Sequence, residues 1–239
     1  MALSGESADE VFGGYKQFFD PQAQQATMFP WLVRYAEFGD DAEILTEATT
    51  KALDLHTYIQ DSYDAAVSGI ERLDGENDFE YRMRKICKLY LTRFLRILLD
   101  RKDRTSMAVG LEVRVPFCDH RLVDYVYNTP WALKTFDGRE KSLLRHATSD
   151  VLPKSVAERV KSPYPSTQDP KYAVALQNNA KEILANPAHT VFEIVDRDWL
   201  AGAVAVDTPQ ITRASRHGLE RTLDIALWLD MYAPTIKTS

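Results

Sequence analysis

The sequence has few of the features that mark secreted or membrane proteins. It contains two cysteines, Cys87 and Cys118, which form no CxxC pair, so we expect a reduced, cytoplasmic protein without a disulfide framework. The longest apolar runs are far shorter than a membrane span, and residues 1–15 are acidic and lack the apolar core of a signal peptide. We therefore expect no membrane association.

Positive charge and histidine are also scarce. The formal net charge of −6 argues against nucleic-acid binding, although it allows a local basic site for phosphates. The five histidines lie in unrelated contexts, which makes a histidine metal site an unattractive interpretation. We find no Ser/His/Asp constellation, no Walker A motif and no GxGxxG motif. The remaining composition, with 45% apolar and 27% charged residues, is that of an ordinary globular protein.

Strand signal is thin, because no run of alternating β-branched residues is longer than a few positions. Apolar residues instead recur every three or four positions, which predicts a mainly helical chain. The predicted helical segments are residues 42–73, 76–100, 140–151, 171–185, 192–205 and 213–232.

The stretch SGESADEVFGGY, which begins at Ser4, has three acidic residues followed by the glycine pair Gly13-Gly14. Ser7 and Glu10 have the spacing of a capping box, which predicts that Ser7 caps a short helix and that Glu10 reaches back to it. The carboxylates of Glu6, Asp9 and Glu10 could also hold a divalent cation such as Mg²⁺. The residues alone leave both interpretations open.

Residues 100–125 and 158–170 break the helical pattern. The second stretch has three prolines, which predict an extended loop that either handles an anion or simply connects two elements. Arg114 could pair with Glu112 or Asp119, as most such charges do. Five basic residues in these stretches could instead hold phosphates or a carboxylate: Arg101, Lys102, Arg104, Arg114 and Lys161.

Three stretches together resemble the glutamine-dependent asparagine synthetases. LSGESADEVFGGY is similar to the family's LSGEGADElFGGY, DRKDRTSMAVGLEVRVPFCDHRLVDYV to R-DR-SMA-GLE-RVPFLDH-LVE, and GREKSLLRHA…LP…RVKSPYPST to GK-LLR-A…LP…R-KKGFP-P. The stretches follow one another in the family's order and cover residues 3 to about 167. Ser7 stands at a usual glycine, Cys118 at a usual leucine and Tyr164 at a frequent phenylalanine, and none of these departures looks disabling.

The resemblance implies the helical C-terminal portion of an α/β synthetase domain of the adenine-nucleotide alpha-hydrolase-like (PP-loop) type. The family's N-terminal glutaminase domain and its SGGLDSS-type pyrophosphatase loop are not found in this sequence. We therefore expect a single domain over residues 1–239, with at most a strand remnant at the N-terminus. We also expect the chain to be inactive alone.

The resemblance also implies a reaction. Aspartate would attack the α-phosphorus of ATP to give β-aspartyl-AMP and pyrophosphate, and ammonia from glutamine would then displace AMP to give asparagine. By motif position, Ser4 and Gly5 would contact ATP, and Asp9 would bind Mg²⁺. Glu6 and Lys161 would be catalytic. The supporting residues would be Glu10, Arg104, Arg114 and Asp119. A homo-oligomer is compatible with the resemblance.

Two other interpretations stay open. The same fold serves β-lactam synthetases and lasso-peptide cyclases, in which the nucleophile is not free ammonia. Alternatively, the chain is a truncated, catalytically silent helical module that binds a partner. The intact GLEVRVPFCDHRLV segment favours the asparagine synthetase, whereas the missing pyrophosphatase loop favours the silent module for the isolated chain.

Overall fold

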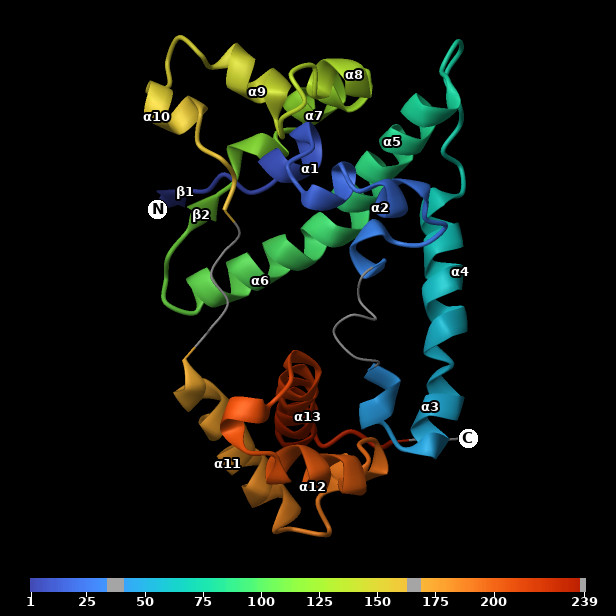
Figure 1. The fold of residues 1–239 in the computed structure, drawn as a ribbon, viewed down its shortest axis with the longest axis vertical. Helices are drawn as coiled ribbons and strands as arrows, with labels where there is room; N and C mark the ends of the chain where they lie inside the picture. Colours follow the sequence, from blue (N-terminus) through green and yellow to red (C-terminus); the bar gives the residue numbers. More distant parts are fainter. Residues whose placement is uncertain (34–40, 163–168, 237–239) are drawn as a thin grey trace. The chain divides into compact units, whose positions relative to one another are not determined.

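The computed structural model describes residues 1–33, 41–162 and 169–236, and most of them are helical (Figure 1). The prediction of a mainly helical chain is thereby confirmed. The chain divides into two compact units: unit 1 comprises Met1–Val33 with Ser62–Ser162, and unit 2 comprises Arg34–Asp61 with Pro163–Ser239. The expectation of a single domain over residues 1–239 stays a prediction.

Unit 1 contains a short parallel strand pair, β1 (Ala2–Leu3) and β2 (Val113–Arg114). The amide of Ser4 donates a hydrogen bond to the carbonyl oxygen of Arg114 at 2.9 Å and extends the pairing by one residue. The expectation of a strand remnant at the N-terminus alone was therefore wrong. The backbone amide and carbonyl groups of a strand need hydrogen-bond partners. The segment around β2, which is rich in β-branched residues, supplies them for β1.

In unit 1, α5 (Asp78–Leu89) and α6 (Leu95–Met107) are joined by a π-helical turn at Tyr90–Phe94 into one long rod (Figure 1). The rod corresponds to the helix predicted over residues 76–100. The shorter helices of unit 1 are α1 (Ala8–Phe12), α2 (Pro21–Gln25), α7 (His120–Tyr127), α8 (Trp131–Lys134), α9 (Ser142–Ala147) and α10 (Lys154–Ala157). The main buried cluster consists of Phe18, Met83, Ile86, Cys87, Tyr90 and Trp131.

Residues 100–125 are more helical than we expected. Helix α6 continues to Met107, and α7 follows a single 3₁₀ turn at Pro116–Cys118. The carboxylate of Asp119 accepts a hydrogen bond from the amide of Arg121 at 2.9 Å and so caps α7. The mixture of charged and apolar residues had concealed both helices.

Unit 2 is built around α11 (Pro170–Leu184), α12 (Arg197–Ala205) and α13 (Arg213–Tyr232), with α3 (Glu47–Leu53) beside shorter turns. Helices α11 and α13 agree closely with the predicted segments. Buried residues of α11, α12 and α13 form a cluster that consists of Leu176, Ala180, Leu200, Ala203 and Leu219. Helix α4 (Leu55–Val67) has residues in both units.

The predicted helix over residues 42–73 is divided into α3 and α4. Asp54 lies between them with a φ of 37°, in the left-handed region that ends a helix. Pro163, Pro165 and Tyr164 lie outside the described residues, whereas Pro170 begins α11. In the described ranges no helix has both the length and the apolar composition of a membrane span.

Candidate active site

The turn from β1 into α1 determines where the acidic residues point. Ser7 has a φ of 76°, and its hydroxyl donates a hydrogen bond to the carbonyl oxygen of Phe117 at 3.2 Å. A capping side chain needs an extended backbone, which this conformation does not provide. Glu10 accepts a hydrogen bond from the hydroxyl of Tyr15 at 2.6 Å and is 1% exposed. The predicted capping box is therefore wrong.

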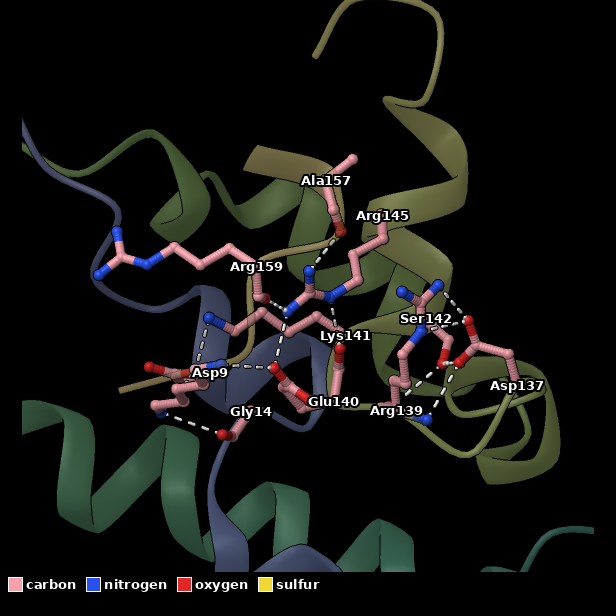
Figure 2. A network of polar contacts seen from close by, with 11 residues as sticks. Asp9, Gly14, Asp137, Arg139, Glu140, Lys141, Ser142, Arg145, Ala157 and Arg159 are labelled. Atoms are coloured by element: carbon pink, nitrogen blue, oxygen red, sulfur yellow. Dashed lines mark hydrogen bonds and ion pairs between the residues drawn. The ribbon is translucent and has the colours of Figure 1, made fainter. Parts of the chain in front are cut away.

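Two lysines converge on Asp9, the second residue of α1. The ammonium nitrogens of Lys141 and Lys161 lie 2.7 Å and 2.8 Å from Asp9 Oδ1 (Figure 2 shows Lys141 beside Asp9). This oxygen is buried, and among the described residues its close polar contacts are these two ion pairs. One carboxylate between two ammonium groups leaves an excess of one positive charge, which suits a phosphate.

Because Gly14 has no side chain, Asp9 and Lys141 can contact each other beside its backbone. A Cβ atom on Gly14 would collide with Asp9 Oδ1 and lie 2.5 Å from Cε of Lys141. Gly13 has a φ of 72°, and a Cβ atom there would collide with the ring of Trp131. The two glycines of the FGGY sequence are thus required for a close approach and a left-handed turn.

Lys161 has two further contacts besides Asp9. Its ammonium nitrogen donates a hydrogen bond to the carbonyl oxygen of Gly14 at 3.0 Å and lies 4.4 Å from the ring centroid of Tyr15. Its backbone amide donates to Oε1 of Glu140 at 3.2 Å. The sequence had assigned Lys161 to a proline-rich loop, and the structure fixes both its backbone and its side chain.

Arg145 on α9 holds the segment that leads to Lys161 (Figure 2). Its guanidinium donates to the carbonyl oxygens of Ala157 at 2.5 Å and Arg159 at 3.0 Å. The same guanidinium lies 2.6 Å from Oε1 of Glu140, and both side chains are mostly buried. Because five guanidinium donors form a rigid fork, one arginine can fix several acceptors at once.

A second polar group lies at the end of β1. Lys102 on α6 contacts Oε1 of Glu6 at 3.0 Å and donates a hydrogen bond to the hydroxyl of Ser4 at 2.6 Å. Oε2 of Glu6 is buried and has no hydrogen-bond partner in the described part of the chain. Such an oxygen is a strong acceptor for a donor that arrives with a ligand. An added Cβ atom on Gly5 would meet no atom within 4 Å, so its backbone faces open space.

The predicted supporting residues lie in different surroundings. Arg104 pairs with Asp100 on the exposed side of α6, at 2.9 Å. Arg114 pairs with Glu112 at 2.9 Å, so of the two partners that the sequence left open the structure has Glu112. Exposed ion pairs of this kind contribute little to stability. The assignment of these side chains to the site stays a prediction.

Two other predicted supporting carboxylates have shifted acidities. Asp119 lies 2.6 Å from the guanidinium of Arg121, whose hydrogen bonds hold the pKa of Asp119 well below its usual range. Burial raises the pKa of Glu10, against the opposing hydrogen bond from Tyr15. Burial likewise raises the pKa of Tyr15, with a further contribution from its bond to Glu10. Both groups therefore favour their neutral forms more than exposed groups do.

Sequence reasoning missed three residues of this arrangement: Tyr15, Lys141 and Arg145. All three lie within stretches that carry the family resemblance, at FGGY and GREKSLLR. Their position in these motifs was the available signal.

Magnesium fits this arrangement only together with a nucleotide. In residues 1–33, 41–162 and 169–236 no group of three or more His, Cys, Asp or Glu side chains could hold a metal ion. Asp9 offers one carboxylate, which two lysines already neutralise. Mg²⁺ is commonly bound by one or two carboxylates, with phosphates and water as the other ligands. The single carboxylate of Asp9 therefore fits a metal ion only where other ligands come from outside the described residues.

Comparisons with known proteins give one family. A family model described as asparagine synthase matches residues 1–230. The chain is 40% identical over 200 residues to glutamine-hydrolyzing asparagine synthetase 3 of Bacillus subtilis strain 168, a match that covers 84% of the chain and 32% of that protein. It is 40% identical over 92 residues to the glutamine-hydrolyzing asparagine synthetase of Gallus gallus, covering 37% of the chain and 16% of the relative.

A third relative has a different name. The chain is 24% identical over 280 residues to amidase chyE of Penicillium rubens, which covers 96% of the chain and 41% of that protein. The chain thus spans less than half the length of each of these three relatives. Because the family model extends over nearly the whole chain and agrees with the motifs quoted above, the chain belongs to the asparagine synthase family.

Proposed function

We propose that unit 1 forms part of the synthetase site of an ATP-dependent asparagine synthetase. The reaction converts aspartate, ATP and ammonia into asparagine, AMP and pyrophosphate through β-aspartyl-AMP. The observation that supports this proposal best is the convergence of Lys141 and Lys161 on Asp9, next to the turn that contains Ser4 and Gly5.

The two lysines suit the step that forms the acyl-adenylate. When the β-carboxylate of aspartate attacks the α-phosphorus, the bond to the leaving pyrophosphate breaks and negative charge accumulates on the pyrophosphate oxygens. Preorganised positive charge that meets this developing charge lowers the barrier. Asp9 holds both ammonium groups in place beforehand, so the positive charge is already gathered at one point.

The neighbouring residues have distinct proposed roles. Ser4 and Gly5 contact ATP, and the open space beside the Gly5 backbone supports this assignment. Asp9 supplies one oxygen ligand to the Mg²⁺ of the nucleotide, and that ion neutralises phosphate charge when bound. Glu6 has a buried carboxylate oxygen without a partner in the described chain, which supports a role as hydrogen-bond or proton acceptor at the reacting groups.

Ammonia is proposed as the second substrate because the two asparagine synthetases above are named as glutamine-hydrolyzing. We also propose a fold of the PP-loop type, a cytoplasmic location and a homo-oligomer. No observation in the described residues favours a β-lactam synthetase, a lasso-peptide cyclase or a silent module.

The proposed intermediate is tested by isotope transfer in the full-length protein that contains this chain. Aspartate labelled with ¹⁸O in its β-carboxylate is incubated with ATP, Mg²⁺ and ammonia, and the AMP is analysed by ³¹P NMR. Attack of the carboxylate on the α-phosphorus transfers one labelled oxygen to AMP. Asparagine formed alongside unlabelled AMP would contradict the proposal.

A further inference from the structure

The ammonium group of Lys161 has one contact that differs in kind from the others. Asp9 is shared with Lys141, and the carbonyl oxygen of Gly14 accepts a single hydrogen bond. The third contact is the face of the Tyr15 ring, 4.4 Å from Nζ to the ring centroid. A cation at this distance is attracted by the negative face of the ring.

The ring of Tyr15 is fixed from several sides. It stacks on Tyr90, with centroids 5.0 Å apart and an angle of 21° between the planes. The ring of Phe94 meets it edge-on at 5.4 Å and 77°. Because both rings belong to the rod of α5, the π-helical turn and α6, Tyr15 presents its face in a constant direction.

Glu10 fixes the remaining rotation of this side chain. Its Oε1 accepts the hydrogen bond from the Tyr15 hydroxyl at 2.6 Å, and the Glu10 side chain is buried. A carboxylate that accepts from a phenol draws the proton toward itself and leaves more electron density on the ring. The ring face toward Lys161 is then more attractive to a cation than that of an isolated phenol.

We propose that Tyr15 is a positioning residue for Lys161, and that Glu10 acts through Tyr15 by fixing and polarising its ring. The ring holds the ammonium group beside Asp9 without neutralising its charge. The ring thereby adds no negative charge that would compete with the leaving pyrophosphate for Lys161. This inference rests on the proposed function for the identity of the anion, and on the described geometry for the contact itself.

The contact is tested first without any reaction. Lysine labelled with ¹³C at Cε is incorporated into the 239-residue chain, and the Lys161 signal is assigned with the variant Lys161→Arg. Protons above an aromatic face are shifted upfield, so we expect the Lys161 ε-protons upfield of those of the exposed Lys154. A Lys161 signal at the position of Lys154 in the wild-type chain would overturn the proposal.

Variants then separate the ring from its hydroxyl. Tyr15→Leu removes the ring and abolishes the upfield shift, whereas Tyr15→Phe keeps the ring and most of the shift. In the full-length protein Tyr15→Leu lowers kcat for pyrophosphate release by roughly 3- to 30-fold, the range expected for one cation–π contact, with little change in KM for ATP. Tyr15→Phe and Glu10→Gln lower kcat less. The Phe variant keeps the ring packing and serves as the test if Tyr15→Leu fails to fold.

The outcomes distinguish this inference from the proposed function. If Tyr15→Leu folds and retains the kcat of the wild type, Tyr15 does not position Lys161, even where asparagine synthesis is established. If the wild type forms no asparagine but the upfield shift depends on Tyr15, the contact stands and the proposed function fails. A fall in kcat that is equal for Tyr15→Phe and Tyr15→Leu assigns the effect to the hydroxyl and its bond to Glu10 rather than to the ring face, and overturns the proposal.

Discussion

Lys161 donates a hydrogen bond from its ammonium group to the carbonyl oxygen of Gly14, 147 residues earlier in the sequence. This contact joins the segment after α10 to the turn after α1, and both segments belong to unit 1. The site is therefore assembled by the fold of unit 1 from residues that are distant in sequence.

Lys141 is expected to contribute to the same charge cluster as Lys161. Lys141→Met keeps most of the aliphatic stem but removes the charge 2.7 Å from Asp9. We expect a fall in kcat for pyrophosphate release of about 10²-fold in the full-length protein, as for other losses of a transition-state charge contact. The double variant with Lys161→Ala should lose less than the product of the two single effects, because both lysines contact one carboxylate.

Lys154→Met is the matched control, because Lys154 is an exposed lysine that pairs with Glu158 one helical turn away. Its kcat should equal that of the wild type. If the double variant instead loses the full product of the two single effects on kcat, the two lysines act independently, which would contradict this prediction.

Gly14→Ala is expected to disrupt the site, because its Cβ atom would collide with the carboxylate of Asp9. Inserting a methyl group into a packed region destabilises by about 1–3 kcal/mol, and here it also displaces Asp9 from both lysines. The midpoint of thermal unfolding and the rate of pyrophosphate release should both fall. Gly202→Ala on α12 is the control, since nothing lies within 4 Å of its Cβ, and it should stabilise by about 0.5–1 kcal/mol.

We expect the variant Ser7→Gly to be more stable than the variant Ser7→Ala. Its left-handed backbone, with a φ of 76°, is unfavourable by roughly 1–2 kcal/mol for a residue with a Cβ atom. Ser7→Gly relieves this strain but loses the bond to Phe117, so a near-neutral change is expected. Ser7→Ala loses the bond and keeps the strain, and a midpoint equal to that of Ser7→Gly in urea would contradict this reasoning.

Glu76 is expected to make stability depend on pH in the acid range. Both nitrogens of Arg84 that face its carboxylate lie 2.8 Å from it, and these hydrogen bonds lower the pKa of Glu76 from its ordinary 4.5. A lowered folded-state pKa stabilises the fold above the unfolded-state value, and this stabilisation disappears as the pH falls through the folded-state value. Glu76→Gln should therefore be less stable than wild type at pH 7, by about 1 kcal/mol, and the difference should narrow below pH 4.

Asp78→Asn is the control for that experiment, because Asp78 forms an exposed pair with Arg72. Its unfolding free energy should change by less than about 0.5 kcal/mol at pH 7. If the difference in unfolding free energy between Glu76→Gln and wild type stays constant from pH 7 to pH 3, the ion pair of Glu76 with Arg84 does not contribute to the pH dependence of stability.

The long amphipathic helices were predictable because their apolar faces repeat over several turns. Helices α11 and α13 lie close to the segments 171–185 and 213–232. Helix α8 has four residues, too few for a periodic signal to emerge. The break at Asp54 was missed because a left-handed aspartate is not recognisable from apolar periodicity.

The candidate site was predictable only in part. The motif resemblance named Asp9 and Lys161, and the structure brings these two together. The capping box at Ser7 failed because the turn from β1 to α1 forces a left-handed backbone that spacing does not reveal. Tyr15 was missed because an aromatic residue normally indicates a core position, whereas the ring of Tyr15 both packs against the core and contacts Lys161.

The most direct measurement of the central claim is the rate of acyl-adenylate formation with and without the Lys161 charge. Wild type and Lys161→Ala are compared in the full-length protein by pyrophosphate release at saturating ATP and aspartate. Lys161 meets charge that develops as pyrophosphate leaves, so the account predicts a fall in kcat of roughly 10²- to 10³-fold with a much smaller change in substrate binding. Equal rates for the two proteins would remove Lys161 from the mechanism and contradict the account.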